Sequence, residues 1–363
     1  MTVPRFQPSS GVALAARTSL RLGGPAEFFA ELARPEQVPE ALDWARARAL
    51  PVLVLGGGSN VVVAERGIAG LVVSLTLAEE SSIARAGDQV EVSIGAGAVW
   101  DDFVARCVAR DWSGLECLSG IPGQVGATPI QNVGAYGQEV CDTLLRVQVH
   151  DRASGASLQL ERAECELSYR TSRFKTRDAG RFIVLGATFR LRVGGSPCVA
   201  YPEIARRVAT PGASPPTLGE VRQAVLETRR QKSMLLDPSD ENGRSCGSFF
   251  LNPQLSTAEL DQLRARSSAT PPVFAQPDGR FKVPAAWLIE QAGFQRGQRF
   301  GAVGISSRHT LALVCHAGAT SDELVSAARR VRDGVAQAFG VWLAPEAQFL
   351  GFEMGADGLP IAS

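Results

Sequence analysis

The sequence predicts an α+β protein that contains two or three domains. With 363 residues, the chain is too long to fold around one ordinary hydrophobic core. Patterns typical of strands dominate the first two-thirds, and a smaller mixed region of helices and strands follows after about residue 235. The sequence contains neither internal repeats nor low-complexity segments. These observations favour separate compact domains, each with its own core.

Hydrophobic periodicity gives the type of each element in the first two-thirds. Apolar residues alternate over 89–97, which is typical of a strand, whereas those of 100–112 recur at helical spacing and form one face. Residues 146–162 are expected to form a hairpin that turns at Ala153–Gly155. The expected elements are, in chain order, a helix at 36–50, strands at 51–55, 61–64, 68–75 and 89–97, a helix at 100–112, the hairpin at 146–162, a strand at 181–193 and a helix at 220–232.

Helix-start signals mark the C-terminal third. Ser256 with Glu259, and Thr320 with Glu323, have the spacing of a capping box, in which each side chain bonds the other residue's backbone N–H. The second box opens a long helix that Gly340 is expected to end. The remaining expectations are strands at 309–318 and 341–352, a β–α–β unit over 309–352, and loops at 210–219 and 266–279.

Composition argues against several classes of function. Lysine plus arginine equals aspartate plus glutamate, 37 each, so the chain lacks the positive charge that nucleic acids and anionic membranes attract. Seven scattered cysteines without a C-x-x-C pair argue against a disulfide framework or zinc site and fit a reducing, cytoplasmic compartment. His150, His309 and His316 lack metal-ligand spacing, so we expect no metal. Neither a signal peptide nor a membrane-spanning stretch is expected.

Two glycine-rich segments are the first candidates for a ligand site. GGGSN (56–60) follows a strand, but the β-rich VVVA comes next, where a Rossmann loop needs a helix, and the chain lacks the G-K-[ST] of a P-loop. Residues 119–139 are too rich in glycine and proline for a helix or a central strand. Because successive glycine N–H groups can bind an anion, the two segments could close on a diphosphate from both sides. A tight turn between strands is the alternative for GGGSN.

Five segments carry a resemblance to a known family: VLVLGGGSNVVV, GLECLSGIPGQVGATPIQNVGAYGQE, SYRTSRFK, GSFFLNP and APEAQFLG. In order and spacing they resemble the motifs of the UDP-N-acetylenolpyruvoylglucosamine reductase (MurB) family, over nearly the whole chain. The resemblance implies an FAD-binding fold of the vanillyl-alcohol-oxidase (PCMH) type in two lobes, plus a smaller α+β substrate-binding domain. Its implied boundaries are 1–78 for the first lobe, rejoined by 340–363, 79–234 for the second, and 235–339 for the substrate-binding domain.

The resemblance also implies non-covalent FAD held by both glycine segments. VAYPEIARRV resembles the tyrosine loop of the longer family type, which would place Tyr201 over the substrate. The residues implied in FAD binding are Gly56, Gly57, Gly58, Ser59, Asn60, Ser119, Gly120, Ile121, Pro122, Gly123, Gly126, Ala127, Gln131, Asn132, Gly134, Ala135 and Tyr136.

The implied activity is that of an NADP-dependent UDP-N-acetylmuramate dehydrogenase of peptidoglycan precursor synthesis. NADPH would reduce the flavin, whose N5 would give hydride to C3 of the enolpyruvyl group of the UDP-sugar and leave an enolate. A cytoplasmic monomer that acts on this small molecule is expected, with no nucleic-acid or membrane partner.

Three residues match the family's catalytic positions. Arg170, in SYRTSRFK, would stabilise the enolate, because a planar permanent cation suits a carboxylate that gains charge. Glu346, in APEAQFLG, matches the catalytic glutamate and is expected to have a raised pKa. Ser248, in GSFFLNP, would give a proton to C2, in a site kept dry by the adjacent phenylalanines. By residue type alone, the three would be a surface ion-pair partner, a solvated carboxylate and a turn hydroxyl.

The substrate contacts follow from the same resemblance. The residues implied are Tyr201, Lys232, Asn252, Gln291 and Tyr169, and a solvated helix end is the alternative for Lys232. This chain departs from many relatives at Leu251, where they have lysine, and at Gln348, where they have arginine. Both differences remove positive charge near the substrate.

Two other functions remain open at this point. An oxidase of the same flavin superfamily would use oxygen as acceptor, but many such enzymes tether FAD through histidine or cysteine, and the glycine segments hold no histidine. A nucleotide-binding module without catalysis would not need Ser248, Arg170 and Glu346 together.

Overall fold

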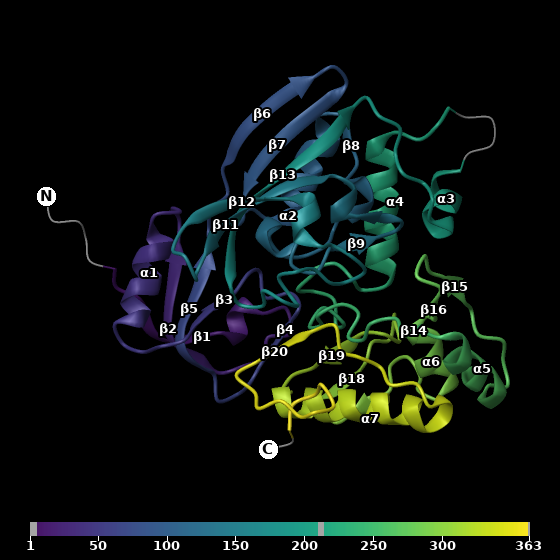
Figure 1. Cartoon of the computed structure of the whole chain (residues 1–363). Helices are drawn as coiled ribbons and strands as arrows, with labels where there is room; N and C mark the ends of the chain where they lie inside the picture. The colour runs from purple at the N-terminus through teal and green to yellow at the C-terminus, as the bar shows by residue number, and fades with distance from the viewer. Residues whose placement is uncertain (1–5, 210–213, 362–363) are drawn as a thin grey trace, which may run out of the picture. The chain divides into compact units, whose positions relative to one another are not determined.

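The computed structural model describes residues 6–209 and 214–361, which form two compact units (Figure 1). Unit 1 comprises the residues up to Val12, Glu27–Gly57 and Ala69–Leu235, and unit 2 comprises Ala13–Ala26, Gly58–Ile68 and the residues from Leu236 onward. The change of unit at Leu235 lies beside the domain boundary expected there. Both units contain parts of the expected first lobe, so the division into two lobes stays a prediction.

A four-stranded sheet forms early in the chain. Its order is β1 (Ser9–Ala13), β2 (Pro25–Leu32), β5 (Ile68–Leu75) and β3 (Val52–Val54). The helix α1 (Gln37–Arg46) connects β2 to β3 and buries Val38, Ala41 and Ala45 in the core of unit 1. The strand β4 (Val61–Val63) follows GGGSN, as its β-rich sequence predicted, and no helix begins there.

The main sheet of unit 1 is antiparallel (Figure 1) and contributes many of the buried residues of this unit's core. Its order is β12 (Ser157–Glu161), β11 (Leu144–Asp151), β13 (Phe182–Val193), β7 (Gln89–Gly95) and β6 (Glu80–Ala86), and β8 (Trp112–Ser113) also pairs with β13. The helix α2 (Trp100–Ala109) packs on it, with ring centroids of Trp100, Phe103 and Phe189 between 5.4 and 6.0 Å apart. The predicted hairpin, long strand and amphipathic helix are confirmed.

Short elements complete unit 1. Residues 119–139 contain one 3-10 helix, an isolated bridge from Gln124 to Val99, and the two-residue strands β9 (Gly134–Ala135) and β10 (Gln138–Glu139), so they form neither an α-helix nor a central strand, as their composition predicted. The helices α3 (Pro202–Val208) and α4 (Leu218–Gln231) share a small core formed by Cys117, Ile204, Val221, Ala224 and Val225. The loop expected at 210–219 lies partly outside the described residues, and Thr217 caps α4.

The long helix α7 (Ser321–Phe339) packs one face into the core of unit 2 (Figure 1). Both predicted capping boxes form, and Gly340 ends α7 with a φ of 72°. The other elements are α5 (Thr257–Arg266), α6 (Ala285–Gln291), a sheet of β14 (Gln254–Leu255), β16 (Phe281–Lys282) and β15 (Phe274–Ala275), and a sheet of β17 (Arg299–Phe300), β18 (Val303–Ile305) and β19 (Leu313–Cys315).

The order strand, helix, strand expected over 309–352 forms as β19, α7 and β20 (Gln348–Leu350), but both strands are shorter than expected and do not pair with each other. Only β19 and β20 form in the two apolar runs, and they belong to different sheets, because β19 pairs with β18 and β20 pairs in parallel with β4. Pro345 interrupts the second run, since proline has no N–H to donate to a ladder. The loop expected at 266–279 contains the short strand β15.

All seven cysteines are free thiols, as their spacing predicted. Within the described part of the chain, every helix is too short or too polar to cross a membrane.

Candidate active site

The two glycine-rich segments meet within unit 1. The main chain of Gly57 lies so close to Gly123 that a Cβ added to Gly57 would come within 2.8 Å of the Gly123 Cα. Gly56 faces the same turn, because its Cβ position is 3.6 Å from Gln124 Oε1 and 3.7 Å from Ala127 Cβ. The two segments therefore approach each other, and the approach requires bare backbone at Gly57.

The second segment is fixed to the elements beneath it. Gly123 O accepts a hydrogen bond of 3.0 Å from the backbone N–H of Trp100, and Gly126 N donates to Ala96 O at 2.8 Å. A Cβ on Gly126 would lie 2.6 Å from Ala96 Cβ. The other predicted cofactor residues here are half-buried, apart from the exposed Ala127: Ile121, Pro122, Gln131 and Ala135. Ser119 is buried, and its Oγ donates to Glu116 O at 2.6 Å.

A charged cluster supports Gly120. Its N–H donates to Asp101 Oδ1 at 2.6 Å, and its carbonyl accepts from Arg229 Nε at 3.1 Å. Arg222 binds both oxygens of Asp101, at 2.6 and 2.9 Å. Burial alone would raise the pKa of Asp101, but the bonds from Arg222 and Gly120 hold it below its ordinary value. Two guanidinium groups face one carboxylate here, so an excess of positive charge lies beside the segment and favours an anionic ligand.

Arg170 lies at the tip of a tight turn in unit 1. Ser168 and Thr171 exchange two backbone hydrogen bonds of 3.1 Å, which leaves Tyr169 and Arg170 as the two central residues. The φ of Arg170 is 52°, a left-handed conformation that favours glycine. Because an arginine in this conformation is strained, the surrounding hydrogen bonds must hold it there.

Three hydrogen bonds join this turn to the second glycine segment. They run from Arg170 Nη2 to Gly134 O (2.8 Å), from Asn132 Nδ2 to Ser168 O (3.2 Å) and from Ser172 Oγ to Ile130 O (2.5 Å). Asn132 also accepts from Cys141 N through its amide oxygen, so this predicted cofactor residue holds the turn in place. The Arg170 guanidinium carbon lies 5.9 Å from the Tyr169 ring centroid.

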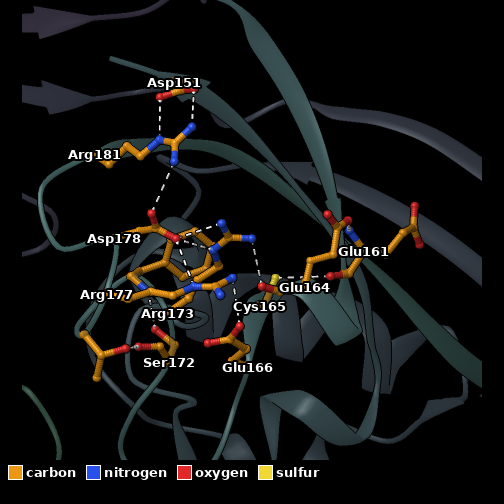
Figure 2. Close-up of polar contacts among 12 residues, drawn as sticks. Asp151, Glu161, Glu164, Cys165, Glu166, Ser172, Arg173, Arg177, Asp178 and Arg181 are labelled. Atoms are coloured by element: carbon orange, nitrogen blue, oxygen red, sulfur yellow. Dashed lines mark hydrogen bonds and ion pairs between the residues drawn. The ribbon is translucent and has the colours of Figure 1, made fainter. Parts of the chain in front are cut away.

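An ion-pair network supports the chain that follows the turn (Figure 2). Arg173 binds Asp178 at 2.7 and 2.8 Å, and Arg181 bonds both oxygens of Asp151 at 3.0 and 2.9 Å. These bonds from Arg173 and Arg181 hold the pKa values of Asp178 and Asp151 below their usual range. The described backbone of residues 166–181 contains no helix and only an isolated bridge. Side-chain ion pairs therefore help to fix the irregular segment 166–181, which carries Arg170.

Two predicted substrate residues gather beside Tyr136 in unit 1. Tyr201 stands at the start of α3, edge-on to Tyr136, with ring centroids 5.3 Å apart. Lys232 Nζ contacts Glu203 Oε2 at 2.5 Å and lies 6.0 Å from the Tyr136 ring centroid. Burial raises the pKa of Tyr136 to about 12, so its hydroxyl stays neutral at physiological pH. Tyr201 is 42% exposed and can contact a ligand.

Ser248 and Glu346 lie on neighbouring segments of unit 2. Phe250 and Pro345 form an antiparallel bridge, flanked by hydrogen bonds from Glu346 N to Phe249 O (2.8 Å) and from Leu251 N to Ala344 O (2.9 Å). Ser248 directly precedes Phe249, the residue opposite Glu346. Gly247 has a φ of 75°, which explains why glycine stands there.

The end of GGGSN holds the Glu346 segment. Asn60 Nδ2 donates to Glu346 O at 3.2 Å, and Asn60 O accepts from Gln348 N at 3.0 Å. Gly58 has a φ of 63°, and a Cβ there would lie 1.9 Å from Arg17 O. Ser59 O accepts a 3.4 Å hydrogen bond from Ser19 Oγ. Asn60 therefore anchors the predicted catalytic glutamate through the main chain.

The remaining predicted substrate residues also lie in unit 2. Asn252 Oδ1 accepts from Ala285 N at 2.9 Å and so fixes the start of α6, and Gln291 is exposed at the end of that helix. Unit 1 thus groups Arg170, Tyr201 and Lys232 around the second glycine segment, while unit 2 groups Ser248 with Glu346. Convergence of the two groups on one substrate stays a prediction.

Two family models match separate parts of the chain, and relatives match almost all of it. Residues 26–161 match the FAD binding domain, and residues 237–350 match the C-terminal domain of UDP-N-acetylenolpyruvoylglucosamine reductase. The UDP-N-acetylenolpyruvoylglucosamine reductase of Thermobifida fusca is 46% identical over 94% of this chain and 97% of its own. The chain belongs to the UDP-N-acetylenolpyruvoylglucosamine reductase family. The protein of that name from Salinispora arenicola is 44% identical over 93% of this chain and 94% of its own.

A solved member of the reductase family shares the fold. The crystal structure of the Thermus caldophilus UDP-N-acetylenolpyruvylglucosamine reductase aligns with a TM-score of 0.64 at 23% identity, covering 95% of this chain and 99% of that one. With the matched FAD binding domain, this likeness confirms the predicted fold class, an FAD-binding fold of the vanillyl-alcohol-oxidase type with a further α+β domain.

The residues of unit 1 fit FAD. Glycine at positions 57 and 126 permits close packing of the two segments and their support, because an added Cβ would lie 2.8 Å from Gly123 Cα and 2.6 Å from Ala96 Cβ. Main-chain N–H groups in glycine-rich turns can bind an anion, and the Arg229 charge lies beside Gly120. Sequence reasoning missed the role of Arg229. It lies four and eight residues after the buried Val225 and Val221 on α4, so helical periodicity could have identified it as inward-facing.

Proposed function

We propose that this chain is an NADP-dependent UDP-N-acetylmuramate dehydrogenase that reduces the enolpyruvyl ether of UDP-N-acetylglucosamine, with FAD bound non-covalently. The observation that carries the proposal is the pairing of the Ser248 and Glu346 segments in a chain 46% identical to a reductase of that substrate over 94% of its length. We place it in the cytoplasm as a monomeric enzyme of peptidoglycan precursor synthesis.

Bound FAD supplies hydride chemistry between NADPH and the enolpyruvyl double bond. The side chains must then orient the double bond, stabilise the negative charge that develops on the carboxylate, and deliver one proton. Each requirement has a candidate residue.

Ser248 is the proposed proton donor to C2. An alcohol is a weak acid in water, but an enolate is a strong base, so a fixed hydroxyl in dry surroundings can transfer its proton by geometry. The backbone beside Ser248 is fixed, because Phe249 donates from its N–H to Leu311 O at 2.9 Å and accepts from Glu346 N at 2.8 Å. The rings of Phe249 and Phe250 are buried and exclude water from this side.

Arg170 is the proposed stabiliser of the developing carboxylate charge. Its guanidinium keeps its charge at any physiological pH and can bond both oxygens of a carboxylate. The hydrogen bond to Gly134 O and the tight turn hold this cation beside the cofactor segment. Glycine would adopt the φ of Arg170 without strain, so the presence of an arginine here supports a role for its side chain.

Glu346 is the proposed partner of Arg170 in stabilising the enolate. To help a developing negative charge, its carboxyl group must be neutral or share a proton, so we expect its pKa to be raised. Its backbone is held on both sides, by Phe249 and by Asn60.

Tyr201 and Lys232 are the proposed contacts to the substrate diphosphate. The ion pair of Lys232 with Glu203 is partly exposed, so the phosphates can replace the carboxylate at little cost. Because Leu251 and Gln348 bring no charge, affinity should depend strongly on Lys232 and Arg170. Asn252, Gln291 and Tyr169 stay proposed substrate contacts.

The test is a visible spectrum of the purified protein, followed by anaerobic titration. The proposal predicts a flavin spectrum that NADPH bleaches and that the enolpyruvyl sugar nucleotide then restores. Acid precipitation should leave the flavin in solution, which excludes a covalent tether. Bleaching by NADPH with recolouring by oxygen but not by the sugar nucleotide would identify an oxidase instead.

A further inference from the structure

A buried carboxylate, Glu116, lies outside the residues proposed for the reaction. It is 1% exposed and accepts three hydrogen bonds, from Gly114 N at 2.8 Å, Gln138 Nε2 at 2.8 Å and Cys198 N at 2.7 Å. All three donors are neutral. Burial of a carboxylate is costly unless its oxygens are fully bonded, so this arrangement indicates a specific role in holding its three partners.

Glu116 connects the two segments that carry the tyrosine pair. Gln138 lies two residues after Tyr136, and its Oε1 accepts from Cys117 N at 2.7 Å. Cys198 lies three residues before Tyr201, and its carbonyl accepts from Cys117 Sγ at 3.2 Å. Residues 116 and 117 therefore bind both the N–H and the C=O of Cys198 while they also hold Gln138.

The chain on the other side of Tyr201 is fixed to the same point. Ile204, on the first turn of α3, is fully buried and packs in the small core that includes Cys117. Tyr201 thus lies between two anchored positions, Cys198 and Ile204, while its own ring is exposed and contacts Tyr136 edge-on. A small shift of either anchor would move the phenol relative to Tyr136.

We propose that Glu116 is a positioning residue that sets Tyr201 against Tyr136 and thereby determines affinity for the diphosphate of the sugar nucleotide. This inference rests on the proposed function. A carboxylate suits the position because three N–H donors need acceptor lone pairs on both oxygens, whereas a glutamine would turn an NH2 group toward one of them.

The experiment is a double-mutant cycle of Glu116→Gln and Tyr201→Phe, measured as steady-state turnover of the holoenzyme. Each single variant should raise KM for the enolpyruvyl sugar nucleotide about tenfold, with little change in kcat. FAD content and the rate of anaerobic bleaching by NADPH should match wild type. The double variant should have a KM close to that of the single variants, because Glu116 acts through the Tyr201 hydroxyl. Multiplicative KM effects, or a loss of kcat at unchanged KM, would overturn the proposal.

Two further variants keep the test decisive. Gln138→Met removes one of the donors to Glu116 without touching the carboxylate, and it should raise KM in the same way even if Glu116→Gln folds poorly. Asp357→Asn alters a carboxylate of unit 2 that bonds Arg329, Arg332 and Leu359 N, and it should lower thermal stability at unchanged KM. A wild-type protein that does not turn over the sugar nucleotide rejects the proposed function, whereas an active wild type with multiplicative KM effects rejects only the role of Glu116.

Discussion

Single residues of the site adopt backbone conformations that most side chains avoid. Gly247, next to Ser248, has a φ of 75°, and Arg170 has a φ of 52°. Glycine adopts this region freely, but an arginine there costs about 1 kcal/mol. The Ser168–Thr171 bridge and the hydrogen bond to Gly134 O hold Arg170 in this strained conformation.

The strain predicts an unusual result for Arg170→Gly. Relief of the left-handed conformation, worth about 1 kcal/mol, should offset the lost hydrogen bond to Gly134, also about 1 kcal/mol. The free energy of unfolding, measured by urea denaturation, should therefore change by less than about 1 kcal/mol, while kcat falls about 10²–10³-fold. Arg173→Gly is the matched control, because it breaks the pair with Asp178 and should lower stability clearly. An Arg170→Gly variant with wild-type kcat would contradict the role of Arg170.

Residue identity alone reveals little of this site. Ser248, Arg170 and Glu346 were found only through the joint pattern of five motifs, since each type is common on loops and surfaces. No sequence pattern singled out Glu116, because a sequence does not show which charged residues in turns are buried. Its burial follows from contacts with Gln138 and Cys198, residues far along the chain.

At the scale of elements, the two glycine segments depend on each other. The main chains of Gly57 and Gly123 lie close together, and the second segment is fixed to Trp100 and Ala96 of unit 1. A side chain at this contact would separate the segments, because its Cβ would meet backbone rather than the flexible end of a side chain.

Gly57→Ala should therefore weaken FAD binding. The added Cβ, 2.8 Å from Gly123 Cα, forces the segments apart, and the purified protein should show a lower ratio of flavin to protein absorbance. Gly219→Ala is the matched control, because its Cβ would lie an ordinary 3.8 Å from Thr217 Oγ1 in α4. That change should leave FAD content intact and stabilise α4 by up to about 1 kcal/mol. Equal FAD content in the two variants would show that the contact at Gly57 does not shape the cofactor site.

Elements with strong local signals were predictable, and elements defined by distant partners were not. The capping boxes at Ser256 and Thr320 and the αL glycine at Gly340 act within one helix turn, so the sequence shows them directly. The run 341–352 reads as one strand by hydrophobicity, but its pairing is divided between Phe250 before Pro345 and β4 after it.

At the scale of the whole molecule, each compact unit collects distant parts of the chain. Unit 2 combines residues 13–26 and 58–68 with the C-terminal part, and the parallel pairing of β4 with β20 joins Val61–Val63 to Gln348–Leu350. Periodicity reports local preference, not pairing partners, so the sequence could predict the α+β class but not these discontinuous units.

Arginine-bound carboxylates in both units predict the pH dependence of stability. Hydrogen bonds from Arg181, Arg173 and Arg332 hold the pKa values of Asp151, Asp178 and Asp357 below the ordinary 3.8. Because the folded state binds these protons less readily than the unfolded chain, the stabilisation is complete above about pH 4 and is lost as pH falls below that.

The free energy of unfolding should accordingly fall steeply below about pH 4. His150 adds a loss that begins as pH falls below about 6.5, because burial lowers its pKa in the folded state and protonation therefore favours the unfolded chain. Urea denaturation across a pH series measures both effects. The Asp357→Asn variant should show a shallower fall of the free energy of unfolding below about pH 4. A free energy of unfolding that stays constant down to pH 3 would contradict the linkage.

The central claim is that Ser248 delivers the proton that completes substrate reduction. The most direct measurement is anaerobic stopped-flow spectroscopy of wild type and Ser248→Ala, first with NADPH and then with the enolpyruvyl sugar nucleotide. We predict equal rates of flavin bleaching by NADPH and a recolouring rate about 10²–10⁴-fold lower in the variant. Recolouring of Ser248→Ala at the wild-type rate would remove Ser248 from the reaction.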